Sequence, residues 1–394
     1  MIVHVPQPLA SPSSQAPSTP VLLLSEGDCL VASGVSDTLA GPQDAIAALA
    51  AAFFARQRDQ REAVLVGAFP FDSAHDAHLI APQSLSRLPL WNLRAAAPAG
   101  GRGVRAMRST PDANGYRARI ATALDRMRNG ELRKVVLSRR LSIEFTEPLD
   151  PLDVVTHLQL DRRVTTFCVP LHSDGGAPGR WLVGATPELL IAKRGSSIQS
   201  APLAGSARRD SEPARDREAA EGLARSDKDR REHATVVEWI ADRLQPYCRT
   251  LKVPATPEVA STATMWHLGT TINGELKDAA TPSIELAAVL HPTPAVCGVP
   301  HGLATEAIAD LEPFDRGFYG GAVGWSAANG DGRWMVAIRC AELAGSTAHL
   351  FAGAGIVSGS DPAAEFDETA AKFATLLNAL GVDASAACRE GGEP

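Results

Sequence analysis

The sequence predicts a mixed α/β (α+β) protein built on large β-sheets. Short apolar runs of strand length recur along the chain, among them RVTTFCVPL, ELLIAKR and AHLFAGAGIV. Fewer segments have the apolar spacing of amphipathic helices, and no internal repeat of about 20 to 50 residues is present. A chain of 394 residues with 45% hydrophobic residues can bury a large core. We therefore expect large sheets with a few intervening helices.

The first third of the chain predicts an arm followed by strands and one helix. Residues 1–20 include a Pro/Ser-rich stretch and are expected to form a flexible N-terminal arm. Residues 21–109 alternate short apolar runs with an Ala-rich helical segment over residues 43–57. We expect these strands and this helix to complete the fold of the part that follows.

From residue 110 the pattern becomes denser and predicts a catalytic domain over residues 110–380. A helix is expected over residues 112–130 and a strand over residues 132–145. Further strand-like runs follow, and a charge-rich helical region covers residues 211–246. Strands return in GFYGGAVGWSA, RWMVAIRCAEL and AHLFAGAGIV. Residues 381–394 are expected to form a C-terminal tail.

Charge and cysteine content limit the classes of partner. The net charge is −7 and the pI about 5.8, and no Lys/Arg run is interleaved with aromatic residues, so we expect no nucleic-acid partner. No apolar run is long enough to span a bilayer, and the N-terminus does not have the pattern of a signal peptide. The six cysteines form no CxxC pattern, and Cys168, Cys297 and Cys340 stand among apolar residues, as thiols in a reducing compartment do. We expect a cytoplasmic protein without membrane contact.

Two acids and a lysine share one side of a helix predicted near the C-terminus. Glu365, Glu368 and Lys372 fall within a sector of about 60°, roughly opposite the apolar stripe of that helix. Two carboxylates three residues apart repel each other by about 0.2–0.5 kcal/mol unless a cation compensates them. Spacing alone favours a solvated face on which Lys372 pairs with Glu368.

A second acidic pair occurs on a helix that is expected to begin at Ser226. Ser226 and Asp229 have the spacing of an N-cap and its reciprocal acid, which is one interpretation of Asp229. Asp229 and Glu232 also fall on or beside the apolar stripe that starts at Val236, where solvated charges do not belong. Two helices with two acids each would form an oxygen-rich site, and oxygen ligands without Cys or His suit Mg²⁺. The acids therefore form a candidate Mg²⁺ site.

Two residues have the surroundings that proton transfer would need, and each has a simpler interpretation. Lys134 lies near the start of a strand, on the same face as Val136 and Ser138, and spacing alone favours an edge-strand lysine that reaches solvent. Glu188 follows Pro187 inside an apolar run, where loss of solvation would raise the pKa of its carboxyl and suit a general acid. An ordinary acid at the start of a strand is the other interpretation of Glu188.

Other residues suit the binding of an anion. Gly205 would let backbone N–H groups approach an anion, or is an ordinary turn glycine. Arg339 is a cation within an apolar strand and needs a partner, either a structural acid or a bound carboxylate. Gly353 and Gly355 would allow a ligand to approach a strand closely. His267 stands alone and fits a core histidine with satisfied hydrogen bonds.

Eight segments, taken in their order, resemble the chorismate-utilising enzymes. They are KVVLSR, GATPELL, PLAGSARR, DKDRREH, LHPTPAVCGVPH, RGFYGGAVGW, AIRCAEL and AGAGIVSGSDPAAEFDET with Lys372, and they cover roughly residues 110–378. The chain is similar in particular to the isochorismate synthases of siderophore and menaquinone pathways. Among these, the pattern most resembles the type that feeds 2,3-dihydroxybenzoate to catecholate siderophores. The first third of the chain resembles the family only in general character.

The resemblance implies a fold and two catalytic roles. The fold is the chorismate-binding fold of anthranilate synthase component I, with large antiparallel sheets and helices around one active site. Lys134 would be the base that activates water, and Glu188 would be the acid at the leaving hydroxyl. The role of Lys134 reverses the interpretation from spacing alone, and so does the role of the acids on the last helix.

The resemblance also implies a cofactor and a set of binding residues. Mg²⁺ would be bound directly by Glu232 and Glu368, and Asp229 and Glu365 would hold metal-bound waters. The residues implied near the chorismate ring and its carboxylates are Gly205, His267, Ala295, Arg339, Gly353 and Lys372.

Members of this family differ in their nucleophile and in whether pyruvate is lost. Ala204 stands where aminodeoxychorismate synthases carry a Lys, and Lys134 is the base that ammonia users generally lack, so we expect no glutaminase subunit. A salicylate synthase, which keeps both proton-transfer residues, and a non-catalytic chorismate-binding module are the alternatives. The LHPTPAVCGVPH segment favours isochorismate synthase. We expect a monomer that converts chorismate to isochorismate with Mg²⁺.

Overall fold

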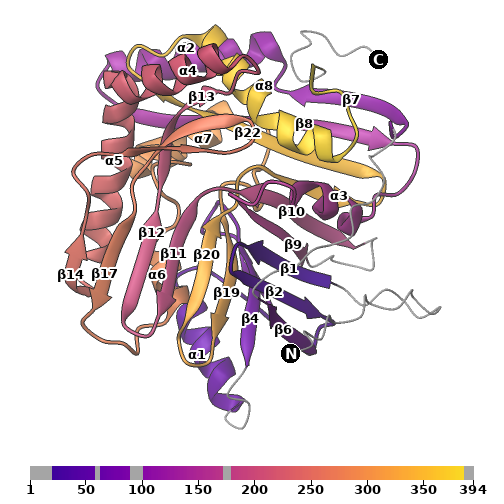
Figure 1. Cartoon of the computed structure of the whole chain (residues 1–394), viewed down its shortest axis with the longest axis vertical. Coiled ribbons are helices and arrows are strands. Elements are labelled where there is room, and N and C mark those ends of the chain that lie inside the picture. The colour runs from indigo at the N-terminus through magenta and orange to yellow at the C-terminus, as the bar shows by residue number, and fades with distance from the viewer. Residues whose placement is uncertain (1–19, 58–62, 89–100, 172–178, 386–394) are drawn as a thin grey trace.

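The computed structural model describes residues 20–57, 63–88, 101–171 and 179–385 (Figure 1). Most of the predicted arm 1–20, the end of the predicted tail 381–394 and Cys388 lie outside these described residues. Within them the chain forms two large β-sheets, one small sheet and the helices that cover them. The predicted mixed α/β class with large antiparallel sheets is confirmed.

The first large sheet contains ten strands, and its pairings are all antiparallel. Its longest pairing joins β8 to β22 and runs from Lys134↔Val357 to Glu144↔Thr347. The spatial order is β18 (Gly298–Val299), β8 (Lys134–Phe145), β22 (Thr347–Val357), β21 (Cys340–Ala344), β10 (Arg180–Thr186), β9 (Thr165–Leu171), β1 (Pro20–Ser25), β2 (Asp28–Ser33) and β6 (Ser84–Leu88), with β7 (Val104–Thr110) also paired to β8.

The second large sheet has nine strands and the small sheet three, again with antiparallel pairings. The order in the second sheet is β14 (Cys248–Lys252), β17 (Ile272–Leu276), β12 (Ser197–Ala201), β11 (Leu189–Arg194), β20 (Gly332–Val336), β19 (Ala322–Ala327), β4 (Val64–Phe69), β5 (Ala77–Ala81) and β3 (Asp37–Gly41). The small sheet consists of β13 (Leu203–Arg208), β16 (Met265–Gly269) and β15 (Glu258–Ser261). Strands from residues 20–88 therefore lie in the same large sheets as strands from the later part of the chain.

Four of the helices in the described residues, α2, α3, α5 and α8, begin at a side-chain N-cap. The Ser226 hydroxyl accepts the Asp229 N–H at the start of α5, and the Asp361 carboxylate accepts two N–H groups at the start of α8. Asp112 caps α2 in the same way. The helices of the described residues are α1 (Ile46–Arg56), α2 (Ala113–Arg128), α3 (Pro151–Leu158), α4 (Pro213–Arg225), α5 (Asp227–Leu244), α6 (Ser283–Leu290), α7 (His301–Leu311) and α8 (Pro362–Ala379).

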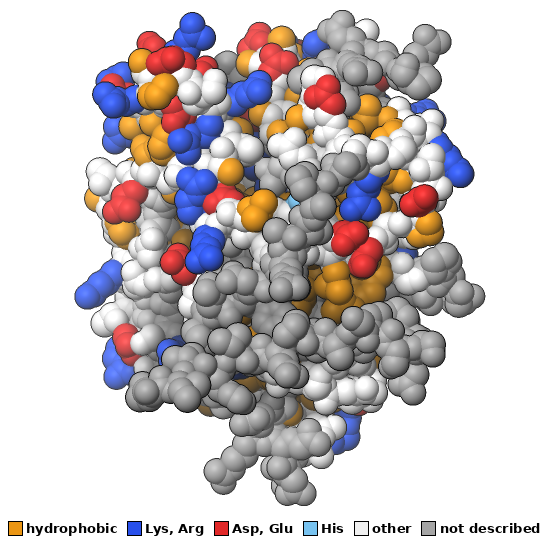
Figure 2. All heavy atoms as spheres, turned by 45° about the vertical axis from the view of Figure 1, so that its right-hand side comes forward, with side chains coloured by type: hydrophobic (Ala, Val, Ile, Leu, Met, Phe, Trp, Pro, Cys, Tyr) orange, Lys and Arg blue, Asp and Glu red, His pale blue; other side chains and the backbone are white. Residues whose placement is uncertain are grey.

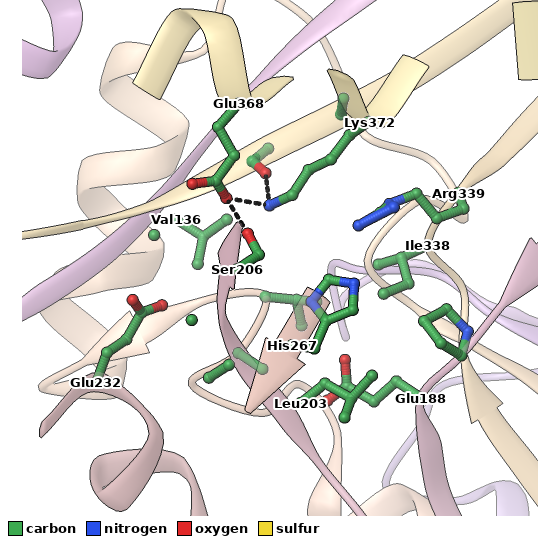
Figure 3. Close-up of a pocket in the computed structure, with 18 of the residues that line it drawn as sticks. Val136, Glu188, Leu203, Ser206, Glu232, His267, Ile338, Arg339, Glu368 and Lys372 are labelled. Carbon is green, nitrogen blue, oxygen red and sulfur yellow. Dashed lines mark hydrogen bonds and ion pairs between the residues drawn. The ribbon is translucent and has the colours of Figure 1, made fainter. Parts of the chain in front are cut away.

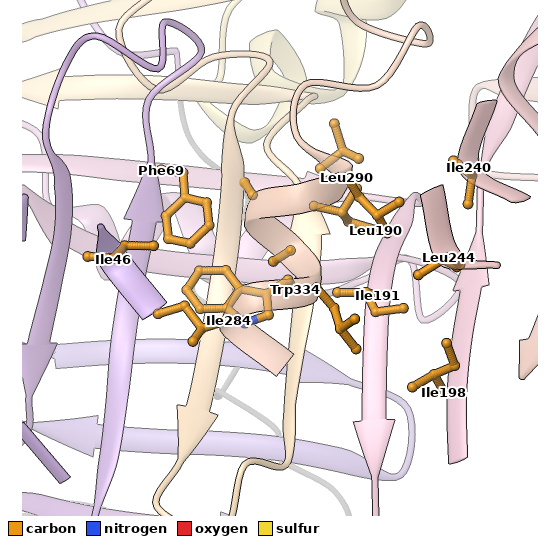
Figure 4. Packing of buried hydrophobic residues seen from close by; sticks show 14 of the residues in the cluster. Ile46, Phe69, Leu190, Ile191, Ile198, Ile240, Leu244, Ile284, Leu290 and Trp334 are labelled. Atoms are coloured by element: carbon orange, nitrogen blue, oxygen red, sulfur yellow. The ribbon is translucent and has the colours of Figure 1, made fainter. Parts of the chain in front are cut away.

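The two large sheets pack face to face, and helices cover their outer faces. A buried cluster between the sheets takes Phe167 and Leu182 from the first sheet and Val323 and Met335 from the second. Helices α3 and α8 pack on the outer face of the first sheet, and α1, α5 and α6 pack on the outer face of the second. Figure 4 shows the packing between the second sheet and these helices, where Trp334 of β20 stacks on Phe69 of β4 with ring centroids 4.6 Å apart. This apolar packing fixes the elements that carry the polar site.

Two runs that the sequence predicts as single strands are each divided between sheets. Pro202 separates β12 from β13, because proline lacks the N–H that a strand ladder needs. Residues 337–339 separate β20 from β21, and Arg339 has a φ of 50°, in the left-handed region. The prediction that Arg339 lies within a strand is therefore wrong, since it lies in the turn where the chain passes from one large sheet to the other.

The outer surface carries charges of both signs. In Figure 2, Lys/Arg and Asp/Glu side chains are interspersed over the upper part of the visible face. Such mixing differs from the one-sided basic surface by which proteins bind nucleic acid. None of the helices in the described residues is long and apolar enough to cross a membrane.

Candidate active site

A pocket between the sheets, α5 and α8 brings together most of the predicted site residues (Figure 3). The small sheet contributes one wall through β13 and β16, and β22 contributes another. Lys134 lies directly behind this lining, with its Nζ 3.0 Å from Oε1 of Glu232. The predicted residues that line the pocket are Glu188, Gly205, Asp229, Glu232, His267, Ala295, Arg339, Gly353, Glu365, Glu368 and Lys372.

The acids of α5 and α8 face this pocket rather than solvent. Glu365 is only 2% exposed, so the interpretation of Glu365 and Glu368 as part of a solvated face is wrong. Burial raises the pKa of Glu365, and the negative charge of Glu368 raises it further. Burial likewise raises the pKa of Asp229, with a contribution from Glu232. Burial and mutual repulsion thus both disfavour the ionised form of these two acids.

Three lysines compensate three of the four acids. Lys134 lies 3.0 Å from Glu232, Lys228 donates to Glu365 at 2.8 Å, and Lys372 donates to Glu368 at 2.5 Å. Burial favours the neutral form of Glu368, but the charge and hydrogen bond of Lys372 dominate and hold its pKa below the usual value. The acids and lysines therefore form one charge-balanced cluster across the two helices and β8.

Lys134 is an interior residue. It is 2% exposed and pairs with Val299 on β18 and with Val357 on β22, so strands flank it on both sides. The interpretation of Lys134 as an edge-strand lysine is therefore wrong. Within the described residues its Nζ has no hydrogen-bond partner of good geometry despite the short distance to Glu232.

Glu188 is buried in the turn between β10 and β11. Burial raises the pKa of its carboxyl to about 7, although a backbone hydrogen bond from Leu203 opposes this shift. The positive charges of Lys134, Lys372 and Arg339 oppose it as well. A carboxyl with this pKa still carries a proton on part of the molecules at neutral pH and can donate it to a ligand.

Cations and a neutral imidazole gather on the other side of the pocket. Arg339 is 6% exposed, and no hydrogen bond or ion pair to its guanidinium is present within the part of the chain that the structure describes. Burial lowers its pKa to about 10. Burial lowers the pKa of His267 well below its usual range, so the ring is neutral. Figure 3 shows Lys372 and Glu188 on opposite sides of the His267 ring, with Arg339 beside them.

Glycines allow the close approach of the pocket walls. Gly205 lies at a bulge in the β13–β16 pairing with a φ of +75°, and an added Cβ would lie 2.9 Å from Cβ of Asp229. At Gly353 a Cβ would lie 2.7 Å from Oγ of Ser138, and the Gly353 carbonyl accepts a hydrogen bond from Lys372 at 2.8 Å. The interpretation of Gly205 as an ordinary turn glycine is wrong, because it lies within β13.

Sequence reasoning assigned no role to several residues of the pocket. Lys228 stands next to Asp229 in DKDRREH, Tyr319 lies in RGFYGG, and Ser206, whose hydroxyl donates to Glu368 at 2.8 Å, lies in PLAGSARR. These segments carried the resemblance, so the signal was present. Their neighbours alone gave no reason to assign a role to these residues.

A family model described as chorismate binding enzyme matches residues 42–381. The chain belongs to this family. The match spans most of the described residues, including every element that lines the pocket.

The curated and solved relatives of this chorismate-binding enzyme agree with the family. The isochorismate synthase DhbC of Bacillus subtilis (strain 168) is 43% identical over 334 residues, 84% of this chain and 83% of that protein. The crystal structure of DhbC from Bacillus anthracis, a candidate 2,3-dihydroxybenzoate-specific isochorismate synthase, has a TM-score of 0.88 at 39% identity and covers 93% of this chain and 96% of that chain. Anthranilate synthase component I from Streptococcus pneumoniae TIGR4 shares the fold, with a TM-score of 0.66 at 19% identity over 95% of each chain.

The donor set of this chorismate-binding enzyme suits Mg²⁺ bound together with a substrate. Carboxylates from two helices face one pocket. Burial raises the pKa values of Asp229 and Glu365, and repulsion by the neighbouring acids adds to the shift, which a divalent cation would oppose. In the residues that the structure describes, however, no group of three or more His, Cys, Asp or Glu side chains is arranged as a metal cage. Mg²⁺ often binds through one or two carboxylates, waters and a substrate, so the acids fit that mode of binding.

Proposed function

We propose that this enzyme is an isochorismate synthase that converts chorismate to isochorismate. The observation that carries the proposal is the placement of a buried, proton-holding Glu188 and the amine of Lys134 at one pocket in a chain of this family. The identity of 43% to the isochorismate synthase DhbC supports the same activity. The 2,3-dihydroxybenzoate-specific assignment of the Bacillus anthracis DhbC supports a role in making a catecholate siderophore.

Binding of chorismate would use the cationic side of the pocket. The Arg339 guanidinium has no protein partner in the described residues, and a bidentate contact with a carboxylate is its most favourable use. Lys372 lies close by and holds the Gly353 carbonyl. We infer that Arg339 and Gly353 hold the enolpyruvyl carboxylate, while Gly205, Ala295 and the neutral His267 line the ring.

Two proton transfers would then complete the exchange of hydroxyl groups. Lys134 acts as the base and takes a proton from water as the water oxygen bonds to C2 of the ring. The ring double bonds shift, and the C4–O bond breaks as Glu188 gives its proton to the departing hydroxyl, which leaves as water. The proton gained by Lys134 and the proton lost by Glu188 balance, so solvent exchange restores both residues. Holding the reactants in this geometry would supply much of the acceleration.

The acids of α5 and α8 would hold Mg²⁺. We propose Glu232 and Glu368 as direct ligands, with Asp229 and Glu365 holding metal-bound waters. Bound there, Mg²⁺ would neutralise the carboxylate of the ring and help to orient it. Ser206 and Lys372 already fix the Glu368 carboxylate, which keeps it directed into the pocket.

Product analysis tests the proposed function. The purified chain is incubated with chorismate and MgCl₂, without ammonium, and the products are separated by chromatography. We expect isochorismate to accumulate and the reaction to stop near an equilibrium mixture, because the two hydroxyl isomers are similar in energy. Release of pyruvate in step with salicylate would identify a salicylate synthase, and binding of chorismate without any product would identify a non-catalytic module. Glu188→Gln is the matched inactive control, since it changes one atom of the proposed acid.

A further inference from the structure

Lys228 lies in the acidic cluster without a role in the proposed chemistry. It is carried by the first turn of α5, and its Nζ donates to Oε1 of Glu365 on α8 at 2.8 Å. Its side chain is 35% exposed, whereas that of Glu365 is 3% exposed. The lysine therefore reaches from the rim of the pocket to an acid at its interior.

Lys228 is coupled to more of the acids than its single ion pair suggests. Its positive charge interacts with Glu365, Glu232 and Asp229, and it also helps to hold the pKa of Glu368 below the usual value. Lys134 and Lys372 also form one ion pair each, but both belong to the proposed chemistry. One ammonium group thus interacts with all four carboxylates that α5 and α8 direct into the pocket.

The Lys228 ammonium lies among the same carboxylates that would attract a divalent cation. Glu365 is too deeply buried to remain charged without a partner, so a cation must accompany its ionised form. In the structure that cation is Lys228. Because its stem is long and its side chain is partly exposed, the amine can swing away to solvent when another cation takes its place.

We propose that Lys228 is the internal cation of the metal-free site and that it competes with Mg²⁺ for the acids around Glu365. This inference rests on the proposed Mg²⁺ site. Lys228 would hold α5 and α8 together before the metal binds. It would also make Mg²⁺ binding weaker than the four acids alone would give, so that the metal is retained mainly when the substrate adds its own carboxylate.

Calorimetric titration of Mg²⁺ into EDTA-stripped protein tests this competition. Lys228→Gln removes the competing charge, so we expect Mg²⁺ to bind about tenfold more tightly than to the wild-type chain. Lys228→Arg keeps the charge and pairs with a carboxylate more rigidly, so Mg²⁺ should bind about threefold more weakly. Arg231→Gln, which removes an exposed cation three residues further along α5, is the matched control and should leave the affinity within about twofold.

Thermal unfolding gives a second measurement that does not depend on catalysis. Without metal, Lys228→Gln leaves Glu365 buried and unpaired, and its Tm should fall by roughly 2–5 °C relative to the wild-type chain. Saturating Mg²⁺ should remove most of that difference, whereas Arg231→Gln should match the wild-type chain in both conditions. A lower Tm of Lys228→Gln both with and without Mg²⁺, together with an unchanged Mg²⁺ affinity, would show that Lys228 only stabilises the contact between α5 and α8. That result would overturn the proposal.

The outcomes separate this inference from the proposed function. Equal or weaker Mg²⁺ binding in Lys228→Gln, or tighter binding in Lys228→Arg, overturns the competition while the wild-type chain still forms isochorismate. If Lys228→Gln does not fold without metal, the Lys228→Arg titration decides the question alone. If the wild-type chain makes isochorismate but binds no Mg²⁺, the proposed Mg²⁺ site is wrong, and the proposed role of Lys228 is then wrong as well.

Discussion

The amine of Lys134 lies 3.0 Å from Oε1 of Glu232, and both side chains are withdrawn from solvent, at 2% and 10% exposure. One of these residues is the proposed base and the other a proposed metal ligand, so the two functions of the site are joined by a single contact. The contact lacks hydrogen-bond geometry. The Lys134 nitrogen therefore keeps its hydrogen-bonding capacity for a water in the pocket.

Replacing Lys134 by glutamine should reduce turnover of chorismate by a factor on the order of 10²–10⁴, the usual contribution of one positioned proton-transfer group. The KM for chorismate should change much less, because Arg339 and Lys372 remain in place. The measurement is chromatographic assay of isochorismate at several chorismate concentrations, with circular dichroism to check folding.

Lys193→Gln is the control for Lys134→Gln. Lys193 is also buried and also paired with an acid, at 3.3 Å from Asp331, but it is not among the residues that line the pocket. Its loss should lower the Tm and leave kcat near that of the wild-type chain. Near-wild-type turnover in Lys134→Gln would show that another group activates the water.

Removal of the metal should abolish turnover, and Mg²⁺ should restore it. Excess EDTA is expected to stop isochorismate formation, and MgCl₂ added beyond the chelator should recover it. Glu368→Gln should lose most of the Mg²⁺-dependent activity while remaining folded. Glu342→Gln is the matched control, because Glu342 is equally an acid of low exposure but pairs with Arg180 away from the pocket. Full activity in EDTA would contradict the metal role.

A methyl group added at Gly355 should displace Glu232. Gly355 pairs with Val136 in the β8–β22 ladder, and its added Cβ would overlap Oε1 of Glu232 and lie 3.4 Å from Cε of Lys134. Because Glu232 can swing away, we expect Gly355→Ala to fold but to lose at least about tenfold in kcat. Gly222→Ala in α4, where an added Cβ meets nothing within 4 Å, should keep full activity. Equal kcat values for Gly355→Ala and Gly222→Ala would show that the position of Glu232 does not affect the reaction.

The fold was largely predictable because its signals are local. The strand run at β8, the cap at Ser226 and the apolar stripe of α5 each depend on neighbouring residues, and the structure contains all of them. The divided runs were not predictable from apolar content, since β20 and β21 differ only in which sheet they join. That choice depends on the left-handed turn at Arg339, which no residue preference indicates.

The site was predictable only where a pattern of known meaning was present. Spacing placed Glu365 on a polar helix face, but whether that face meets water or a second acidic helix is a tertiary fact. The assignment of Lys134 to a sheet edge was wrong for the same reason. Lys134 pairs with β18, whose residues lie more than 160 positions further along the chain. Lys228 had no prediction at all, since its partner Glu365 lies on α8.

The pH dependence of turnover should report Glu188. Its carboxyl must carry a proton to act as an acid, and burial sets its pKa at about 7. The protonated fraction of Glu188 therefore falls as pH rises through 7. The ratio of the wild-type kcat/KM to that of Glu188→Gln should decline by about tenfold per pH unit well above that value, because any pH dependence of the base is common to both chains. Glu188→Gln should show low activity without this decline. A ratio that stays constant from pH 7 to 9 would be incompatible with Glu188 as the acid.

The same carboxyl should make the folded chain less stable as pH rises. The pKa of Glu188 is about 7 when folded and has its ordinary value of 4.5 when the chain is unfolded, so between these values the folded state binds more protons. Ionisation of the buried group then costs stability, and this cost is complete above pH 7 and absent below pH 4.5.

Glu188→Gln keeps the shape of the side chain and cannot ionise. We expect it to raise the free energy of unfolding at pH 8 by on the order of 2–3 kcal/mol and to change it little at pH 5. Thermal or urea unfolding at the two pH values measures the difference. A variant that is inactive yet more stable at pH 8 would show that the buried Glu188 carboxyl lowers the stability of the fold. A variant that is less stable at pH 8 would mean that the folded chain favours the carboxylate form of Glu188.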